Sequence, residues 1–309
     1  MKFDMHFHST LSDGRNTPNE ILENIGDSGL SLVALTDHDT ISGDEFVSEV
    51  KQSGIHSNPA VEISAMDYEL GKSLHLTCYA QQFEQEVYDI LNNTVAKKRE
   101  MILAQVSKLA HNGFIIDGEE LYDYFEKGGR DINTLNKFNI AEYLFQNLEN
   151  EKIIPTLVGE NFSLEGFYLN FLKEGGKYYE KYGERIDEYE PSIEVCGAMA
   201  QVNNAILAIA HPQFSFSRFG IHTFQDDILP RYVDAGINAI EVHSKTPKSW
   251  LNAIYEAKKK YNLILTAGSD NHGLGHSDSK HTLLGEINPY LSEEQQEEIL
   301  REYMRFLER

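Results

Sequence analysis

The sequence predicts an α/β fold in which seven buried parallel strands alternate with helices and a helical insertion follows the fourth strand. Short apolar runs flanked by turn residues recur along the chain, which is typical of parallel strands covered on both faces. Segments with helical signals separate most of these runs, and this is the strand–helix–strand order of a parallel sheet. No such apolar run occurs between about residues 84 and 204, and this gap predicts the insertion.

Seven segments fit the pattern of a buried strand. The first opens the chain and ends in the alternating pair His6 and His8. Most of the later segments also end in, or just before, a charged or imidazole side chain. The predicted strands are Lys2–His8, Leu32–Thr36, Asn58–Ile63, Ser73–Ala80, Ala205–Ala210, Asn238–Val242 and Leu263–Ala267.

Helix-starting signals support the segments between these strands. Thr17, Pro18 and Glu20 form a capping box with proline at the first helical position. Ser292 and Gln295 form a second capping box, which opens a C-terminal helix. The predicted helices outside the insertion are Pro18–Ser28, Asp44–Ser53, Phe224–Ala235, Pro247–Tyr261 and the helix that follows Ser292.

The stretch from residue 84 to residue 204 breaks the alternation. Val87–Ala110 carries apolar residues at helical spacing, whereas Lys173–Glu190 is rich in Gly, Tyr and charged residues and predicts a loop. We therefore expect a main domain of residues 1–83 and 205–309, and an insertion domain of residues 84–204 that covers or flanks the functional site. The other predicted helices of the insertion are Ile140–Leu148, Leu164–Leu172 and Pro191–Asn203.

Composition is typical of a soluble globular protein. The chain has 309 residues, 41% of them hydrophobic, and a net charge of −22. This charge disfavours binding through nucleic-acid phosphates and argues against duplex DNA as a partner. The two cysteines, Cys78 and Cys196, give no disulfide framework and fit a reducing compartment. With no signal peptide and no membrane-spanning run, the predicted location is the cytoplasm, away from membranes.

Side chains that bind metals stand at or near the ends of most predicted strands. His6 and His8 are two residues apart and so face the same way on a strand, and Asp13 lies on the loop that follows. In parallel α/β folds the C-terminal strand ends converge on one face, so we expect these side chains to share one pocket. Mixed imidazole and carboxylate ligands without a thiolate suit Mn²⁺, Fe²⁺ or Zn²⁺. The set is His6, His8, Asp13, His38, Glu62, His75, His211, Asp270 and His272.

The motifs that contain these residues span nearly the whole chain. They are His6-Phe7-His8, Ser12-Asp13-Gly14, Leu35-Thr36-Asp37-His38-Asp39, Val61-Glu62-Ile63-Ser64, His75, Ala210-His211-Pro212 and Gly268-Ser269-Asp270-Asn271-His272-Gly273. In this order they resemble the polymerase-and-histidinol-phosphatase (PHP) superfamily of metal-dependent phosphoesterases. The inserted domain places the resemblance near the stand-alone nucleotide phosphatases, which include the 3′,5′-nucleoside bisphosphate phosphatases.

The resemblance implies a distorted seven-stranded (β/α)7 TIM-like barrel with a trinuclear metal site. The implied ligands are His6, His8, Glu62 and Asp270 for the first ion, Glu62, His75 and His211 for the second, and Asp13, His38 and His272 for the third. The leading hypothesis is a phosphatase that acts on a nucleoside mono- or bisphosphate. In this hypothesis a metal-bridging hydroxide attacks phosphorus in line with the leaving oxygen.

Basic side chains are the candidates for binding the substrate phosphate. Arg99 resembles an arginine that relatives carry on the first inserted helix. Lys137 and Asn139 stand where relatives often have arginine and histidine, and this departure weakens the transfer of bisphosphate specificity. Arg130 and Arg218 are further candidates.

Asp13 and His243 are the predicted catalytic side chains. His243 follows the sixth strand on the ligand-bearing rim, where it could contact phosphate or donate a proton. Asp37 and Asp39 flank a predicted ligand and could accept hydrogen bonds from ligand imidazoles, or they are simply turn residues. The remaining histidines lie away from strand ends and are expected on the surface: His56, His111, His222, His276 and His281.

Three other functions stay open. Trimming of short oligoribonucleotides from the 5′ end would use the same site, because a mononucleotide-sized end fits it. A metal-dependent amidohydrolase would share the barrel design, but no strand-end lysine stands among the ligands. A non-catalytic, metal-stabilised module would resemble PHP domains that support a polymerase, yet the chain has no polymerase segment.

Overall fold

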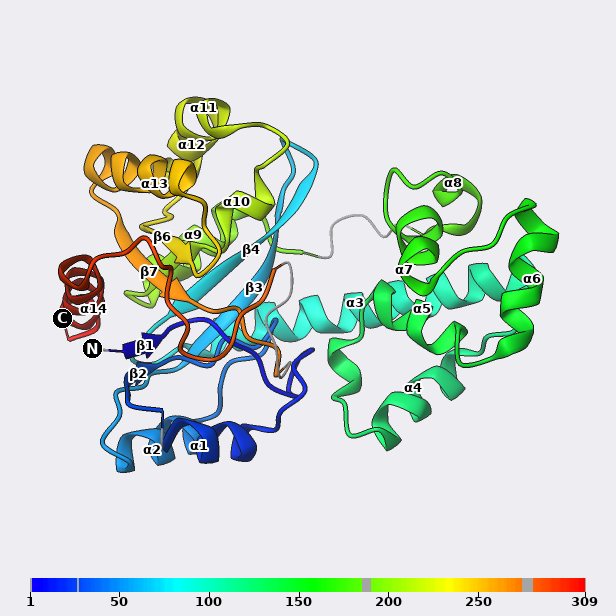
Figure 1. Ribbon diagram of the computed structural model, residues 1–309, viewed down its shortest axis with the longest axis horizontal. Helices are drawn as coiled ribbons and strands as arrows, with labels where there is room; N and C mark the ends of the chain where they lie inside the picture. Colours follow the sequence, from blue (N-terminus) through cyan, green and yellow to red (C-terminus); the bar gives the residue numbers. More distant parts are fainter. Residues whose placement is uncertain (1, 27, 185–189, 274–279, 309) are drawn as a thin grey trace. The chain divides into compact units, whose positions relative to one another are not determined.

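Seven strands in the described part of the chain form two sheets (Figure 1). This computed structural model describes residues 2–26, 28–184, 190–273 and 280–308. One sheet pairs β1 with β2, and the other joins the remaining five strands in chain order. The strands are β1 (Lys2–Asp4), β2 (Leu30–Val33), β3 (Ala60–Asp67), β4 (Lys72–Tyr79), β5 (Ile206–Ile209), β6 (Ala239–His243) and β7 (Ile264–Gly268).

The predicted parallel arrangement is wrong for β4, which runs antiparallel to both β3 and β5. Only residues 68–71 connect β3 to β4, and a parallel crossover needs a dozen residues or more. The Asp67 carboxylate accepts hydrogen bonds from the backbone N–H groups of Glu69 and Leu70, and Gly71 takes a positive φ of 59°. These features form a tight turn, so the chain reverses at this point.

The first strand is shorter than predicted, because β1 ends at Asp4 and the following residues pair elsewhere. The Met5 N–H donates to Ala267 O, and an isolated bridge joins Phe7 to Asn271 beyond the end of β7. A second bridge joins His38 to Glu62 of β3. The predicted seven-stranded barrel is not confirmed, since the two sheets are not closed into one, but these bridges bring the metal-binding motifs next to one another.

Helices pack on the sheets from several directions (Figure 1). Contacts join α14 to β7 and β5, α13 to β6, and α9 to β3 and β5, while α1 packs on α2. Both predicted capping boxes form, one between Thr17 and Glu20 and one between Ser292 and Gln295. These helices are α1 (Pro18–Gly26), α2 (Asp44–Gln52), α9 (Ile193–Val202), α10 (Pro212–Ser215), α11 (Ile221–Thr223), the π-helical η3 (Phe224–Ile228), α12 (Leu229–Asp234), α13 (Lys248–Tyr261) and α14 (Glu293–Leu307).

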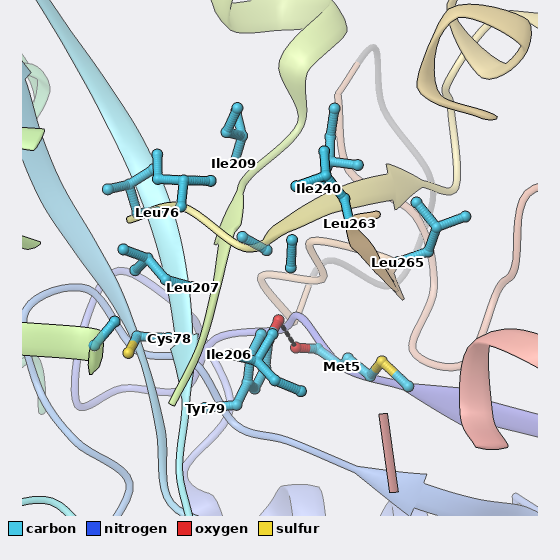
Figure 2. Packing of buried hydrophobic residues seen from close by; sticks show 14 of the residues in the cluster. Met5, Leu76, Cys78, Tyr79, Ile206, Leu207, Ile209, Ile240, Leu263 and Leu265 are labelled. Atoms are coloured by element: carbon cyan, nitrogen blue, oxygen red, sulfur yellow. Dashed lines mark hydrogen bonds between the residues drawn. The ribbon is translucent and has the colours of Figure 1, made fainter. Parts of the chain in front are cut away.

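The largest core cluster lies on the five-stranded sheet (Figure 2). Leu76, Ile206 and Ile240 from three neighbouring strands are completely buried in it. The Tyr79 hydroxyl donates a hydrogen bond of 2.7 Å to Met5 O, the contact drawn as a dashed line in Figure 2. This bond fixes the segment that leads to the first histidine pair against β4.

The chain divides into two compact units, one of Met1–Leu91 with Glu190–Arg309 and one of Asn92–Tyr189. We call them the sheet unit and the helical unit. The long helix α3 (Gln85–His111) contains the boundary between them. The predicted insertion, residues 84–204, extends beyond the helical unit at both ends, and its role as a substrate cap stays a prediction.

The helical unit has its own apolar core, which includes Phe114, Phe167 and Phe171. The predicted loop over residues 173–190 is wrong in part, because Tyr179–Tyr182 forms a helical turn in which Tyr182 is fully buried. The elements of this unit after α3 are α4 (Gly118–Lys127), the 3₁₀ turn η1 (Ile132–Thr134), α5 (Lys137–Leu144), α6 (Leu148–Val158), α7 (Leu164–Phe167), the π-helical η2 (Tyr168–Leu172) and α8 (Tyr179–Tyr182). Among the described helices, none has both the length and the apolar character that crossing a membrane requires.

Candidate metal centre

The carboxylate of Glu62, on β3, lies at the centre of a cluster of imidazoles. Nitrogen atoms of five histidines lie within 3.3 Å of its two oxygens, more than the roughly four hydrogen bonds that a carboxylate can accept. The distances to Oε2 are 3.1 Å from His6 Nε2, 3.0 Å from His8 Nε2 and 3.3 Å from His38 Nδ1, and those to Oε1 are 3.2 Å from His75 Nδ1 and 3.1 Å from His211 Nε2.

Two further carboxylates complete the cluster. Asp270 Oδ1 lies 3.2 Å from His8 Nε2, and Asp13 Oδ1 lies 3.2 Å from His272 Nε2 and 3.8 Å from His38 Nε2. The structure thus brings all nine predicted ligand residues together. Three groups with ligand atoms within 4.8 Å of one another account for eight of them: His6, His8, Glu62 and Asp270; His38, Glu62 and His75; and His8, Asp13, His38 and His272. The ninth, His211, contacts Glu62.

Sharp turns after the strands aim these side chains inward. His211 follows β5 with a positive φ of 31°, and Asp270 follows β7 with a positive φ of 53°. Non-glycine residues rarely take this conformation, and such strain concentrates at functional sites. The Asp270 N–H donates to His6 O and the His8 N–H to Asn271 O, so the first and last motifs are held side by side.

The residues present fit divalent metal ions. Within the described part of the chain, Glu62 Oε2, Asp13 Oδ1 and His211 Nδ1 are buried and have no hydrogen-bond partner. Two ligand atoms on one Zn²⁺-sized ion lie about 3 Å apart, which is close to most of the spacings around Glu62. Imidazole and carboxylate donors without a thiolate suit Mn²⁺, Fe²⁺ or Zn²⁺. The cluster is therefore chemically suited to bind divalent cations.

The outer nitrogens of three histidines are held by hydrogen bonds. His6 Nδ1 lies 2.8 Å from Glu241 Oε1, His8 Nδ1 lies 3.3 Å from Ser12 Oγ, and His272 Nδ1 lies 2.8 Å from Asp270 O. These acceptors hold a ring proton on Nδ1, so that Nε2 faces the centre and carries the lone pair whenever the imidazole is neutral. This is the tautomer that a metal ligand needs.

Glu241 is a functional residue that the sequence reasoning did not single out. It is completely buried on β6, where its carboxylate accepts hydrogen bonds from His6 Nδ1–H at 2.8 Å and from the His211 N–H at 2.5 Å. The signal was present in the sequence, because a charged residue stands inside the apolar run Ala239–His243. A carboxylate in a buried strand needs such partners.

Glu241→Gln should lower the affinity for Mn²⁺ by roughly 10- to 100-fold, since the amide accepts the His6 proton more weakly than a carboxylate does. Calorimetric titration of the metal-free protein with Mn²⁺ would measure this change. An unchanged affinity would show that Glu241 does not orient His6.

The Asp37 and Asp39 carboxylates accept hydrogen bonds from serines, and their predicted contact with ligand imidazoles stays a prediction. The Asp37 carboxylate accepts hydrogen bonds from Ser9 N–H, Ser9 Oγ and Ser12 Oγ, and Asp39 accepts from Ser64 N–H and Oγ. Each of these serine donors lies 2.8 Å or less from the carboxylate that it contacts. Asp37 therefore orients Ser12 Oγ, which in turn contacts His8 Nδ1.

Charges within the cluster shift its pKa values strongly. Burial disfavours the charged imidazole of His8, but the neighbouring carboxylates of Asp270 and Glu62 outweigh this effect and raise the pKa of His8 to about 10. Burial also disfavours the Glu62 carboxylate, yet the nearby imidazoles of His6 and His38 hold its pKa well below the usual range. In the metal-free protein, protons therefore occupy nitrogens that metal ions would use.

Binding of Mn²⁺ should release protons, because an imidazole ligand must be neutral. The pKa values of His6 and His8 are raised by neighbouring carboxylates against the effect of burial, so protons compete with metal at neutral pH. The apparent affinity should consequently rise with pH throughout the range below the raised pKa of His8, about 10. Calorimetry in buffers of different ionisation enthalpy would count the protons, and a pH-independent affinity would contradict the expectation.

His243 and His281 both lie beside Asp270. His243, at the end of β6, is fully buried, and its Nε2 is 4.0 Å from Asp270 Oδ2. Burial lowers the pKa of His243 to about 4. The expected surface position of His281 is wrong: its side chain is 24% exposed, its Nε2 is 3.9 Å from Asp270 Oδ2, and its ring centroid is 4.3 Å from that of His272. The chain that follows the last motif returns to the centre, which spacing along the sequence does not reveal.

Three of the other four histidines expected on the surface lie in the described part of the chain. His56, His111 and His222 are exposed, as predicted. His276 lies outside the described residues.

The predicted phosphate-binding side chains have other partners. In the helical unit, Arg99 stacks on the Tyr122 ring, Arg130 pairs with Glu142 at 3.1 Å, and Lys137 Nζ donates to Glu184 O. In the sheet unit, Arg218 is exposed beside the Phe219 ring. Their roles in substrate binding stay predictions.

Three curated relatives share sequence with this chain. The longest match is to a phosphoribosyl 1,2-cyclic phosphate 1,2-diphosphodiesterase of Eggerthella lenta, at 25% identity over 87% of this chain and 94% of that protein. A 5′-3′ exoribonuclease of Haemophilus influenzae is 42% identical over 24% of this chain and 27% of its own length. A 3′,5′-nucleoside bisphosphate phosphatase of Chromobacterium violaceum is 40% identical over 20% of this chain and 22% of its own length.

The fold also matches a solved structure. A protein from Bifidobacterium adolescentis, named as a metal-dependent phosphoesterase, superposes with a TM-score of 0.70 over 97% of this chain and 95% of that chain, at 23% identity. The mixed α/β architecture is therefore shared. Residues 4–205, well over half of the sequence, match the family model described as the PHP domain. The chain therefore belongs to the PHP domain family.

Proposed function

We propose that this PHP-family hydrolase of phosphate esters acts on a phosphate monoester of a nucleotide, either a nucleoside monophosphate or a 3′,5′-bisphosphate. The observation that carries the proposal is the convergence of five imidazoles on the buried Glu62 carboxylate. Such a cluster suits the binding of divalent cations, and cations attract an anionic ester in spite of the net charge of −22.

The names of the relatives support a ribose phosphate as the shared feature of the substrate. The phosphoribosyl cyclic phosphate, the RNA chain and the nucleoside bisphosphate each carry phosphate on a ribose. We infer that the enzyme recognises the ribose phosphate of its substrate first.

The residues of the chain have distinct roles in this proposal. Three divalent ions, when bound, would supply positive charge to the phosphoryl oxygens and would make water more acidic. His6, His8 and Asp270 would hold one ion together with Glu62, while the other predicted ligands would hold two more. Asp13 is the candidate catalytic carboxylate, since its side chain is 26% exposed and can be reached by water and substrate.

A second candidate is the hydrolysis of a cyclic phosphodiester of ribose. The relative from Eggerthella lenta favours it, because that match extends over 94% of the relative.

The exonuclease alternative is supported by a shorter match of 76 residues. The amidohydrolase alternative has less support, since the sequence has no lysine among the predicted ligands at the strand ends. The non-catalytic alternative predicts that no ester is hydrolysed.

Hydrolysis of phosphate esters by the Mn²⁺-loaded protein tests these proposals, measured as inorganic phosphate from the monoesters and by chromatography as the ring-opened monoester from the cyclic ester or the free nucleotide from RNA. The substrates would be p-nitrophenyl phosphate, nucleoside 5′-monophosphates, a nucleoside 3′,5′-bisphosphate, a ribose 1,2-cyclic phosphate and a short 5′-phosphorylated RNA. Fastest turnover of a nucleotide monoester supports the leading proposal, and preference for the cyclic ester supports the second candidate. Absence of hydrolysis across the panel, with metal bound, would contradict the proposed function.

A further inference from the structure

His243 presents a different nitrogen to the centre from the neighbouring histidines. Its Nδ1 accepts a hydrogen bond of 3.0 Å from the Lys245 N–H, so the ring proton of the neutral imidazole must be on Nε2. Nε2 faces Asp270 Oδ2 at 4.0 Å. It is buried and, within the described residues, has no hydrogen-bond partner. His243 therefore directs an N–H group, and not a lone pair, toward the centre.

This tautomer argues against a role as a metal ligand. A metal binds the lone pair of an imidazole nitrogen, and in neutral His6 and His272 that lone pair is on Nε2, because their Nδ1 groups donate to Glu241 and to Asp270 O. In His243 the lone pair is on Nδ1 and is already used by the backbone of Lys245. The remaining function of Nε2 is hydrogen-bond donation.

The surroundings of His243 hold this donor in place. The Asn288 side chain donates to His243 O at 2.9 Å and to Thr246 O at 2.8 Å, which fixes the turn after β6. The ring of Phe214 packs edge-on at a centroid distance of 5.3 Å, and that of His211 lies at 6.4 Å. A donor held in this way needs no reorganisation when a ligand binds.

We propose that the His243 Nε2–H group donates a hydrogen bond to a phosphoryl oxygen of the substrate, and that His243 is not a metal ligand. The inference rests on the proposed function, since it assigns the ligand of the same centre. A phosphoryl oxygen is the acceptor that such a substrate brings beside Asp270. Donation from a neutral imidazole also leaves the charge of the centre unchanged.

Two substitutions test the roles of the two His243 nitrogens separately. In His243→Asn the amide oxygen can replace Nδ1 as the acceptor for Lys245 N–H, but nothing replaces the donor at Nε2. In His243→Gln the longer side chain can place an amide N–H near the position of Nε2. Binding of inorganic phosphate to the Mn²⁺-loaded proteins would be measured by calorimetry, and bound metal by elemental analysis.

The dissociation constant for phosphate should rise by roughly 10-fold or more in His243→Asn, with the metal content unchanged. His243→Gln should bind phosphate within about 3-fold of the parent protein, because a donor is retained. The exposed His222→Asn serves as the matched control and should bind phosphate normally. Unchanged phosphate affinity in His243→Asn, or the loss of a metal ion, would overturn the proposal.

The test distinguishes a loss of phosphate binding from misfolding of the variant and from a loss of turnover. Circular dichroism would establish that each variant is folded, and His243→Phe, which keeps the ring volume and removes both nitrogens, replaces His243→Asn if that variant does not fold. Phosphate binding needs no turnover. The measurement therefore stands even if the parent protein hydrolyses none of the esters tested, in which case the proposed function fails and the phosphate site is judged separately.

Discussion

Glu62→Gln should remove bound divalent metal and lower kcat/KM for a phosphate monoester by roughly 10³-fold or more. Both carboxylate oxygens face imidazole nitrogens, with three rings at Oε2 and two at Oε1. Glutamine has nearly the same shape, but its amide nitrogen offers no lone pair to a cation and its charge is lost. The variant thus removes the shared ligand and keeps the packing. Elemental analysis of the dialysed protein and p-nitrophenyl phosphate hydrolysis would measure both effects.

Glu49→Gln is the matched control for this experiment. Glu49 is exposed on α2 in the same unit, so the same chemical change there should leave metal content and turnover unaltered. If Glu62→Gln kept the full complement of metal and the parent turnover, the centre would not be organised around this carboxylate.

Gly268→Ala should destabilise the protein by about 3 kcal/mol, because the new methyl group has no space. A Cβ at this position would lie 2.4 Å from His6 Cβ and 2.6 Å from the His6 backbone nitrogen. Gly268 is the last residue of β7, and the segment that carries His6 passes directly over it. Either the backbone of His6 or the end of β7 must move, so we also expect weaker metal binding. Denaturant unfolding of the metal-free protein would measure the loss.

Gly26→Ala is the corresponding control. Gly26 ends helix α1, and a Cβ added there meets no atom within 4 Å outside the helix's own backbone. Alanine should be neutral or should stabilise the helix by less than about 1 kcal/mol. Equal stability of the Gly268→Ala and Gly26→Ala proteins would show that β7 and the first motif are not packed as closely as described.

The sequence alone predicted the membership of the metal cluster. His6, Glu62 and Asp270 are far apart along the chain, but each follows or occupies a short apolar run, and this placement was enough to expect a common pocket. His75 stands in the first half of β4, and because β4 runs antiparallel to β5, this half lies beside the C-terminal end of β5, where Leu76 pairs with Ile209. The wrong direction of β4 therefore left the predicted cluster intact.

The tertiary structure decided the parts that depend on contacts between distant segments. The position of His281 beside Asp270 arises only when the chain returns to the centre, and the Glu241–His6 hydrogen bond joins residues 235 positions apart. The sequence determined which side chains could bind metal, because residue type and local spacing fix donor chemistry. The fold determined which nitrogen of each imidazole faces the centre, because the ring proton follows the hydrogen-bond partner, and that partner comes from elsewhere in the chain or from a local turn.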